Sequence, residues 1–360
     1  LWGQDNYCMI GNHAVPVVVD AILKGLPGID VDKAYEAVKM SLTTPHLNSP
    51  FEVWDQYGYM PEDLQTQSVS ITLEQSFDDW CAAQLAKHLN KAKDYEFFMK
   101  RSAYYRNLHH PETKFFQPKN SKGEWILPFD PYKYGANGGY PFTEGNGWQY
   151  TFFAPQDPYG LIALFGGDKP FTTKLDGFFT NTDSMGEGAS SDITGLIGQY
   201  AHGNEPSHHV AYLYAYAGEQ WKTAEKVRFI MSDFYTDQPD GIIGNEDCGQ
   251  MSAWYLLSSM GLYQVNPSDG VFVFGSPCFK KVEVKVRGGN TFTVEAPNNS
   301  KENIYIQKVY LNGKPYDKSY ITYQDIINGS TLKFVMGKKP NKNFGKAPAN
   351  RPVVLNKING

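Results

Sequence analysis

The sequence predicts a mainly α-helical protein built from paired helices and followed by a small antiparallel β unit. Apolar residues recur with a helical period over most of residues 15–261, and many of these segments end in a glycine, which is typical of helix C-termini. After residue 265 the pattern changes to alternating apolar and polar residues separated by turn residues, which is typical of strands. We therefore predict a helical domain over residues 1–265 and a small β-strand region over residues 266–360.

The first half of the helical domain begins with a predicted helical hairpin, in which Pro27-Gly28 separates two apolar-periodic segments and Asp30 or Asp32 is placed to cap the second. A loop rich in proline, asparagine and aromatic residues follows over 43–67. One long helix comes next, with a single buried side predicted by its apolar positions. The helices of this half are expected at residues 15–26, 31–42, 68–89 and 94–108.

Residues 109–139 show no period, and an irregular segment of this length in a compact domain is usually functional. Beyond it we expect helices at residues 148–154, 158–165, 169–179, 194–200, 208–216, 223–235 and 251–261. The alternating pattern then predicts strands at residues 271–274, 281–286, 291–294, 304–311 and 331–335. Helices of similar length joined by long loops are what a ring of helical hairpins gives, with functional loops on one rim.

Composition excludes several classes of protein. The chain has 360 residues, a formal net charge of −5 and no basic segment of the kind that nucleic acid requires, so nucleic acid is excluded as a partner. No apolar run reaches the ~18 residues of a membrane span. The four cysteines (Cys8, Cys81, Cys248 and Cys278) lack the spacing of a zinc site and are expected to be buried thiols. Because the chain begins Leu1-Trp2-Gly3, we expect it to be part of a longer protein.

The most informative stretch is Gly-Asn-Glu-Asp-Cys-Gly-Gln over residues 244–250, which comes directly before an apolar helical segment. Carboxylates on a tight turn at a helix N-terminus are held rigidly, and the helix dipole favours their charged form. Asp247 is therefore a candidate general base or metal ligand. The simpler alternative is that Glu246 or Asp247 only caps the helix.

A second loop, Glu-Gly-Asn-Gly-Trp-Gln-Tyr over residues 144–150, places one acid among glycines and near an indole. Partial desolvation there would raise the pKa of Glu144, which is how a general acid is made. The alternative is that Glu144 only supplies a negative charge at the start of the next helix.

A third loop, over residues 202–209, contains three histidines, Asn204 and Glu205. Its spacing does not fit a zinc site, whereas the oxygen donors Asn204 and Glu205 suit a hard cation such as calcium. On the long helix, Glu74 and Asp78 lie four residues apart on one face and would repel each other unless paired. We interpret these two acids as structural hydrogen-bond anchors.

Two acids on separate loops, Glu144 and Asp247, are the arrangement that glycoside hydrolysis requires. One carboxyl must be protonated to release the leaving oxygen, and the other must be ionised to activate water or to attack the sugar. The spacing in sequence leaves an inverting or a retaining outcome open.

The same loops carry a family resemblance. The segments GYMP, SVSITLEQSFDDWCAAQLAK, EGNGWQYTFFAPQD, GLIALFGG, YAHGNEPSHHVAYLYAYAG and DGIIGNEDCGQMSAWYLLSSMGLYQVNP resemble glycoside hydrolase family 92, and the match covers residues 1–340 in order. That family consists of calcium-dependent, inverting α-mannosidases, most of them bacterial. The resemblance implies an (α/α)6 helical-hairpin barrel, normally preceded by an N-terminal β-sandwich domain that this chain lacks, together with the first barrel helices. It also implies a periplasmic, cell-surface or secreted location.

The resemblance also implies roles for residues. Glu144 matches the general acid and Asp247 the general base; some relatives have an acid where this chain has Asn245, which cannot deprotonate water. Asn204 and Glu205 match the region that contacts the terminal mannose and Ca²⁺, so the expected metal ligands are Asn204, Glu205 and Asp247. The expected sugar contacts are Trp148, Gln149, Asn204, Glu205, His208, His209 and Asn245, with Asn12 and His13 as further residues that face the site.

Together these expectations describe an exo-acting, α-1,2-specific mannosidase that acts on glycans or mannan, with the missing N-terminal domain as a partner. Two alternatives remain open. One is another (α/α)6 glycosidase that works without calcium. The other is a carbohydrate-binding fragment that holds sugar without cleaving it.

Overall fold

The computed structural model describes residues 9–47, 49–134, 140–183 and 193–358. The chain divides into two compact units. The first unit comprises Leu1–Leu164, Asn181–Ile193 and Asn356–Gly360, and the second comprises Phe165–Thr180 and Thr194–Leu355. Each unit is described by itself. The expected division of the chain between residues 265 and 266 stays a prediction.

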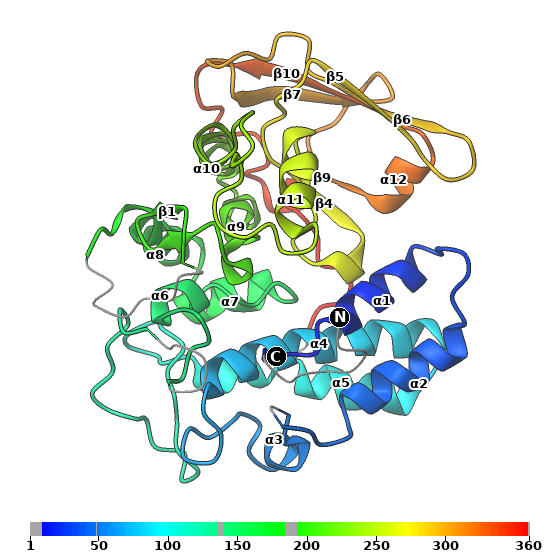
Figure 1. Cartoon of the computed structure of the whole chain (residues 1–360). Helices are drawn as coiled ribbons and strands as arrows, with labels where there is room; N and C mark the ends of the chain where they lie inside the picture. The colour runs from blue at the N-terminus through cyan, green and yellow to red at the C-terminus, as the bar shows by residue number, and fades with distance from the viewer. Residues whose placement is uncertain (1–8, 48, 135–139, 184–192, 359–360) are drawn as a thin grey trace. The chain divides into compact units, whose positions relative to one another are not determined.

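The first unit begins with the predicted helical hairpin. Helices α1 (Ala14–Leu23) and α2 (Val31–Ser41) follow each other along the chain (Figure 1). Asp30 is the N-cap of α2, as expected, and its side chain accepts a hydrogen bond of 3.2 Å from the backbone N–H of Lys33. The local sequence is therefore enough to define where this helix starts.

The long helix α4 (Ser68–His88) forms the centre of the first unit, with α5 (Ala92–Arg101) and α1 packed beside it (Figure 1). Its limits match the prediction closely. The expectation of a single buried side is wrong, because every residue from Ser68 to Ala86 is buried. Neighbouring segments surround the helix, so its serine, threonine and acidic residues form hydrogen bonds inside the protein rather than with water.

The loop expected at residues 43–67 contains a short helix that the pattern did not predict, α3 (Phe51–Tyr57). Phe51 and Trp54 on this helix are buried, and Gly58 ends it in the left-handed conformation. A 3-10 turn (Tyr104–Leu108) follows α5, and the described residues between 109 and 134 contain no helix or strand, as expected. Helices α6 (Gly147–Tyr150) and α7 (Pro158–Phe165) come next along the chain, and all of α7 except its last residue belongs to the first unit.

The second unit contains the predicted helices α8 (Asp168–Thr180), α9 (Leu213–Tyr216), α10 (Gln220–Asp233) and α11 (Gln250–Ser259). They lie within a few residues of their predicted positions, and a 3-10 turn (Val210–Tyr212) opens α9. The helix expected at residues 194–200 is wrong. This segment instead forms the short antiparallel strands β1 (Leu196–Ile197) and β2 (Tyr200–Ala201), because Gly195 and Gly198 adopt positive φ angles that a helix does not allow.

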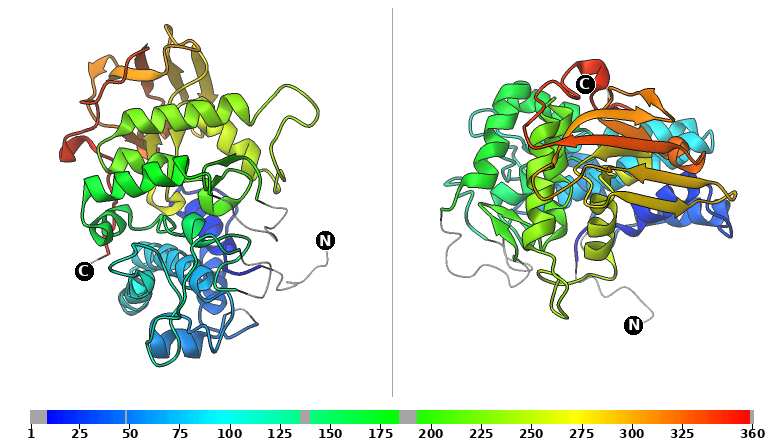
Figure 2. Two further views of the ribbon diagram at one scale, coloured as in Figure 1. Left: turned by 90° about the vertical axis from the view of Figure 1, so that its left-hand side faces the viewer. Right: turned by 90° about the horizontal axis from the view of Figure 1, so that it is seen from above.

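The remaining strands form two sheets (Figure 2). The larger one has the order β5-β6-β10-β7-β8, with β5 at Lys281–Lys285, β6 at Thr291–Glu295, β10 at Thr331–Gly337, β7 at Tyr305–Leu311 and β8 at Lys314–Pro315. The smaller sheet has the order β3-β4-β9, with β3 at Leu262–Tyr263, β4 at Val271–Phe274 and β9 at Tyr320–Thr322. All pairs are antiparallel except β10 with β6, which is parallel.

Alternating side chains of these strands form an apolar core that includes Phe274, Phe292, Val294, Leu332 and Phe334. A short helix that the pattern did not predict, α12 (Tyr323–Ile327), follows β9 and begins with a capping box between Thr322 and Asp325. Helix α10 contacts β7, and its Glu225 accepts a hydrogen bond from the Tyr305 hydroxyl.

Candidate active site

Glu144 lies in the first unit, on the turn before α6, and is half-buried. Its backbone has φ +46°, a left-handed conformation that only a few per cent of non-glycine residues adopt. The next residue leaves little room, because a Cβ on Gly145 would lie 3.0 Å from the ring of Tyr150 and 3.1 Å from Gln149 Oε1. A strained backbone conformation of this kind persists only where the surrounding contacts hold it in place, and such conformations cluster at functional sites.

The turn is held by a capping box at the start of α6. Asn146 Oδ1 accepts hydrogen bonds from the N–H groups of Trp148 (3.0 Å) and Gln149 (3.1 Å), and Gln149 Oε1 accepts one from Asn146 N–H (3.0 Å). Gln149 also donates to the Tyr134 hydroxyl at 2.7 Å. The buried Trp148 ring contacts Phe115 edge-on, with 4.9 Å between the ring centroids.

The same turn is fixed to the N-terminal half of α4. Thr143 N–H donates to Ser70 Oγ at 2.9 Å, and the Tyr150 hydroxyl donates to Glu74 Oε1 at 3.0 Å. Burial and the neighbouring carboxylates of Glu74 and Glu144 raise the pKa of Tyr150 well above its usual value, so this hydroxyl stays a donor. Tyr150 therefore links the backbone of the Glu144 turn to a buried acid of the central helix.

Glu74 and Asp78 are bridged by His13. His13 Nε2 donates to Glu74 Oε2 at 2.8 Å and Nδ1 donates to Asp78 Oδ1 at 2.9 Å, which confirms the two acids as hydrogen-bond anchors. Desolvation lowers the pKa of His13, but the charges and hydrogen bonds of Asp78 and Glu74 outweigh it and hold the pKa well above its usual value. Only glycine fits at position 11, where a Cβ would lie 2.7 Å from His13 Nε2 and φ is +77°.

In the second unit, the two acids of the loop before α11, Glu246 and Asp247, have different surroundings. Glu246 is the cap: its Oε2 accepts from Gly249 N–H at 2.6 Å and its Oε1 accepts from Ser252 N–H at 3.3 Å, and these bonds lower its pKa. Asp247 is exposed and has φ +54°, and Cys248, also exposed, has φ +56°. The simpler explanation of this stretch thus holds for Glu246, while the Asp247 side chain is presented at the surface of the unit.

The histidines of the 202–209 loop are part of the interior of the second unit. His202 lies between the hydroxyls of Tyr200 (2.8 Å to Nδ1) and Tyr235 (2.7 Å to Nε2), and burial lowers its pKa to about 2. His208 Nε2 donates to the His202 carbonyl at 2.8 Å and its Nδ1 accepts from Gln250 at 3.0 Å. Burial lowers the pKa of His208 to about 4, so this ring is neutral and both of its nitrogens are engaged.

The 202–209 and 244–250 loops touch each other through glycines. A Cβ on Gly244 would lie 3.3 Å from Gly203 Cα and 2.5 Å from Thr194 Oγ1. Gly203 leaves even less space, since its Cβ would meet the same hydroxyl at 1.9 Å. The two loops therefore approach each other at Gly203 and Gly244, and Asn204 and Asn245 each follow one of these glycines.

The donors near this contact fit calcium by type. Asn204, Glu205 and Asp247 each offer side-chain oxygen atoms, which Ca²⁺ prefers as ligands. Thr194 Oγ1 is a further buried oxygen, for which the described residues provide no hydrogen-bond partner. Within that part of the chain no three or more His, Cys, Asp and Glu side chains gather as a metal site. A calcium ion here would therefore complete its ligand set with amide, carbonyl or water oxygens.

The predicted site residues are divided between the units. The first unit carries Glu144, Trp148 and Gln149, and the second carries Asn204, Glu205, His208, His209, Asn245 and Asp247. Asn204, His208 and His209 are buried, whereas Glu205 and Asn245 are exposed. A sugar hydroxyl at His208 would have to compete with its two hydrogen bonds, and the assigned roles of all these residues stay predictions. The raised pKa expected for Glu144 also stays a prediction.

Sequence reasoning missed the residues that support the loops. Tyr150 and Gln250 stand inside the motifs themselves, but their roles depend on partners that are distant in sequence. Asn12 donates from its backbone N–H to Asp78 Oδ2 at 2.8 Å and so belongs to the His13 cluster. Of the cysteines, Cys81 is buried as expected, Cys278 is partly buried and Cys248 is exposed; Cys8 lies outside the described residues.

These features define a class: a mainly helical protein in which glycine-rich loops present single carboxylates. Residues 1–338 match the sequence model of the glycosyl hydrolase family 92 catalytic domain. The chain therefore belongs to glycosyl hydrolase family 92.

Solved structures agree with this assignment. The family GH92 α-mannosidase BT3965 from Bacteroides thetaiotaomicron, in complex with mannoimidazole, is 41% identical and has a TM-score of 0.94 over 99% of this chain and 47% of its own. The inverting mannosidase BT2199 from the same organism is 36% identical, with a TM-score of 0.87 over 97% of this chain and 49% of its own. The expected fold class, a mainly α protein of the (α/α)6 type with a small β part, is thereby confirmed.

Among curated proteins, an uncharacterized secreted glycosidase of Arthroderma benhamiae is 31% identical over 91% of this chain and 45% of its own length. The chain thus spans about half the length of the relatives it matches. In the described part of the chain, no helix is both long and apolar enough to cross a membrane.

Proposed function

We propose that this chain is the catalytic part of an exo-acting α-mannosidase that removes terminal, α-1,2-linked mannose from glycans or mannan by inverting single displacement. The observation that carries the proposal is the left-handed backbone shared by Glu144 and Asp247, each on a glycine-rich loop of a family 92 chain. The similarity to an inverting mannosidase, and to an α-mannosidase that binds mannoimidazole, supports the substrate class and the stereochemistry.

In this mechanism Glu144 donates a proton to the leaving glycosidic oxygen, and Asp247 accepts a proton from the attacking water. Room for that water requires roughly 6.5–9.5 Å between the two carboxyl groups in the active enzyme. Asn245 lies two residues before Asp247, but its amide accepts no proton, so Asp247 carries the base function alone. Trp148, Gln149, His208, His209 and Asn245 are proposed to contact or support the sugar.

Asn204, Glu205 and Asp247 are the proposed calcium ligands. When bound, calcium would act as a Lewis acid and template for the mannose O2 and O3 hydroxyls and favour a distorted ring. The glycan is the proposed partner, together with an N-terminal β-sandwich domain of the complete protein. The curated relative described as a secreted glycosidase supports a secreted, cell-surface or periplasmic location.

The test is release of mannose from α-1,2-mannobiose by the chain, with calcium and then with EDTA, reading the product anomer by NMR before mutarotation. We expect calcium-dependent release with β-mannose formed first. Formation of α-mannose first would contradict inversion, and full activity in EDTA would contradict the calcium requirement. If no mannose appears even when the N-terminal domain is restored, the proposed hydrolysis is wrong.

A further inference from the structure

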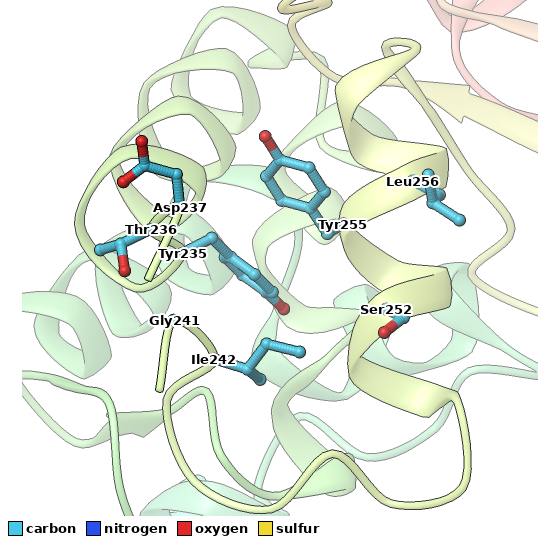
Figure 3. A pocket seen from close by; sticks show the side chains of 8 residues that line it. All are labelled: Tyr235, Thr236, Asp237, Gly241, Ile242, Ser252, Tyr255 and Leu256. Atoms are coloured by element: carbon cyan, nitrogen blue, oxygen red, sulfur yellow. The ribbon is translucent and has the colours of Figure 1, made fainter. Parts of the chain in front are cut away.

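A pocket of about 490 Å³ lies in the second unit between the turn at residues 235–242 and one face of α11 (Figure 3). Its walls include Tyr235, Asp237 and Ile242 from the turn and Ser252, Tyr255 and Leu256 from the helix. The turn is closed by hydrogen bonds from Thr236 N–H to the Gly241 carbonyl (2.8 Å) and from Ile243 N–H to the Phe234 carbonyl (3.2 Å). None of the residues predicted for catalysis lines this pocket.

One wall of the pocket is a fixed aromatic surface. The Tyr235 ring is nearly parallel to Trp254, with 5° between the planes and 6.0 Å between the centroids, and lies 4.8 Å from the Tyr255 ring. The Tyr235 hydroxyl is anchored at His202 Nε2 (2.7 Å) and near the Met251 carbonyl (3.3 Å). A ligand would therefore meet rings that are already ordered, which lowers the entropic cost of binding.

The polar groups of the pocket suit a neutral ligand with many hydroxyls. Asp237 is exposed and offers a carboxylate that accepts hydrogen bonds. Thr236 and Ser252 add hydroxyls that both donate and accept hydrogen bonds. Among the described residues that line the pocket there is no lysine, arginine or histidine, so an anionic ligand would meet the negative charge of Asp237 without a compensating cation. An apolar wall with a few polar groups is typical of small-molecule sites, and here it matches the apolar face and the hydroxyls of a pyranose.

The pocket adjoins the loop that carries the proposed base. Ile242 and Ser252 are each five residues from Asp247, so an extended chain places their Cα atoms at most about 18 Å from that of Asp247. Ser252 also takes part in the loop, since its N–H donates to Glu246 Oε1. A glycan long enough to extend from Asp247 would therefore come within reach of Tyr255.

We propose that this Tyr235–Tyr255 pocket binds a second, neutral hexose residue of the mannose-containing glycan, apart from the terminal residue that is cleaved. The inference rests on the proposed function for the identity of the glycan. The Tyr255 ring supplies the apolar contact, and Asp237 accepts hydrogen bonds from sugar hydroxyls.

The experiment measures binding rather than hydrolysis. In a Glu144→Gln background, which prevents turnover, calorimetry compares linear α-1,2-mannotetraose with methyl α-mannoside, which fills only a terminal site. We expect Tyr255→Ala to weaken mannotetraose binding about tenfold and Asp237→Asn to weaken it several-fold. Asp240→Asn, an exposed acid of the same turn outside the pocket, is the matched control and leaves binding unchanged.

Methyl α-mannoside binding is expected to stay the same in all these variants. Unchanged mannotetraose binding in both Tyr255→Ala and Asp237→Asn would overturn the proposal, as would equally tight, Tyr255-dependent binding of maltotetraose. If Tyr255→Ala is unstable, Ser252→Phe fills the pocket without deleting a wall and is expected to have the same effect. Hydrolysis is measured separately, with Glu144 restored and the N-terminal domain present. Tyr255-dependent binding with no hydrolysis in that protein supports the pocket and contradicts the proposed function, whereas hydrolysis together with Tyr255-insensitive binding contradicts the pocket alone.

Discussion

Glu144 and Asp247 share a backbone conformation that glycine adopts far more readily. Hydrogen bonds from neighbouring side chains stabilise both positions. Asn146 and Gln149 fix the turn after Glu144, and Glu246 caps the helix after Asp247. The capping hydrogen bonds therefore offset the conformational strain of an acidic residue in the left-handed region. As a result, the backbone that carries each carboxylate is held in one conformation, which suits a catalytic acid or base.

The acid role of Glu144 predicts a dependence on the leaving group. Glu144→Gln is expected to lower kcat strongly for α-1,2-mannobiose and much less for an aryl mannoside, because a good leaving group needs little protonation. Steady-state kinetics with the two substrates tests this. Glu124→Gln, at an exposed position of the same unit, serves as the control. An equal loss on both substrates would remove Glu144 from the acid role.

His13 predicts a pH dependence of stability. Its pKa is raised in the folded state by Asp78 and Glu74, so the folded state binds the proton more tightly than the unfolded state. This contribution is fully present below the usual histidine pKa of about 6.5 and is lost as the pH rises through the raised value. The stability difference between wild type and His13→Gln should therefore be largest at acidic pH and shrink above neutrality.

Urea unfolding midpoints over a pH series measure that difference. The control is His88→Gln, the same substitution at an exposed histidine at the end of α4. If the difference in urea midpoint between wild type and His13→Gln grew as the pH rises, protonated His13 would not be the group that bridges Glu74 and Asp78. The side chain of His13 is 42% exposed, so solvent screening reduces the size of the effect but not its sign.

At the scale of the element, α4 is buried on every side although it carries several acids. Asp79 is paired with Arg101, whose Nε donates to Asp79 Oδ2 at 2.9 Å, and Trp54 Nε1 donates to the same oxygen at 3.1 Å. Both members of the ion pair are almost fully buried. Pairing of this kind lets a helix with polar residues on all faces occupy the centre of a unit.

Removing one partner of this pair should cost far more than breaking a surface pair. Asp79→Ala leaves Arg101 buried without its close partner and is expected to lower the free energy of unfolding by about 3–5 kcal/mol. Glu283→Ala removes an exposed pair with Lys281 and is expected to cost much less, because water already solvates both charges. Chemical denaturation of both variants compares them, and similar losses would contradict the importance of burial.

At the scale of the whole molecule, calcium is expected to stabilise the folded chain. A ligand that binds only the folded state adds about 2.7 kcal/mol at a concentration of 100 times its Kd. Calcium should therefore raise Tm in a concentration-dependent way. Replacing Asn204 with Ala or Glu205 with Gln should reduce the shift, because each change removes or weakens an oxygen donor.

Differential scanning calorimetry with calcium, with magnesium at equal ionic strength and with EDTA provides the measurement. Gln238→Ala, at an exposed residue outside the proposed ligands, should keep the full shift. A shift that is the same for magnesium, or that both ligand variants retain, would contradict the proposed ligand set.

Much of the architecture follows from the sequence because it depends on neighbours along the chain. The period of apolar residues defined α1, α2, α4, α7, α8, α10 and α11, and capping residues such as Asp30 defined starts. The helix expected at residues 194–200 failed because two left-handed glycines outweighed the apolar period. The same local reasoning selected the Glu144, Asn204 and Asp247 loops, which the motifs mark directly.

The tertiary structure decided what depends on distant partners. It exposed Asp247, it engaged both ring nitrogens of His208, and it joined Glu74 and Asp78 through His13. It also buried α4 on all sides and paired β10 with β6 in parallel. A sequence pattern records the type of each side chain and its spacing, whereas burial and pairing arise only when segments far apart along the chain pack together.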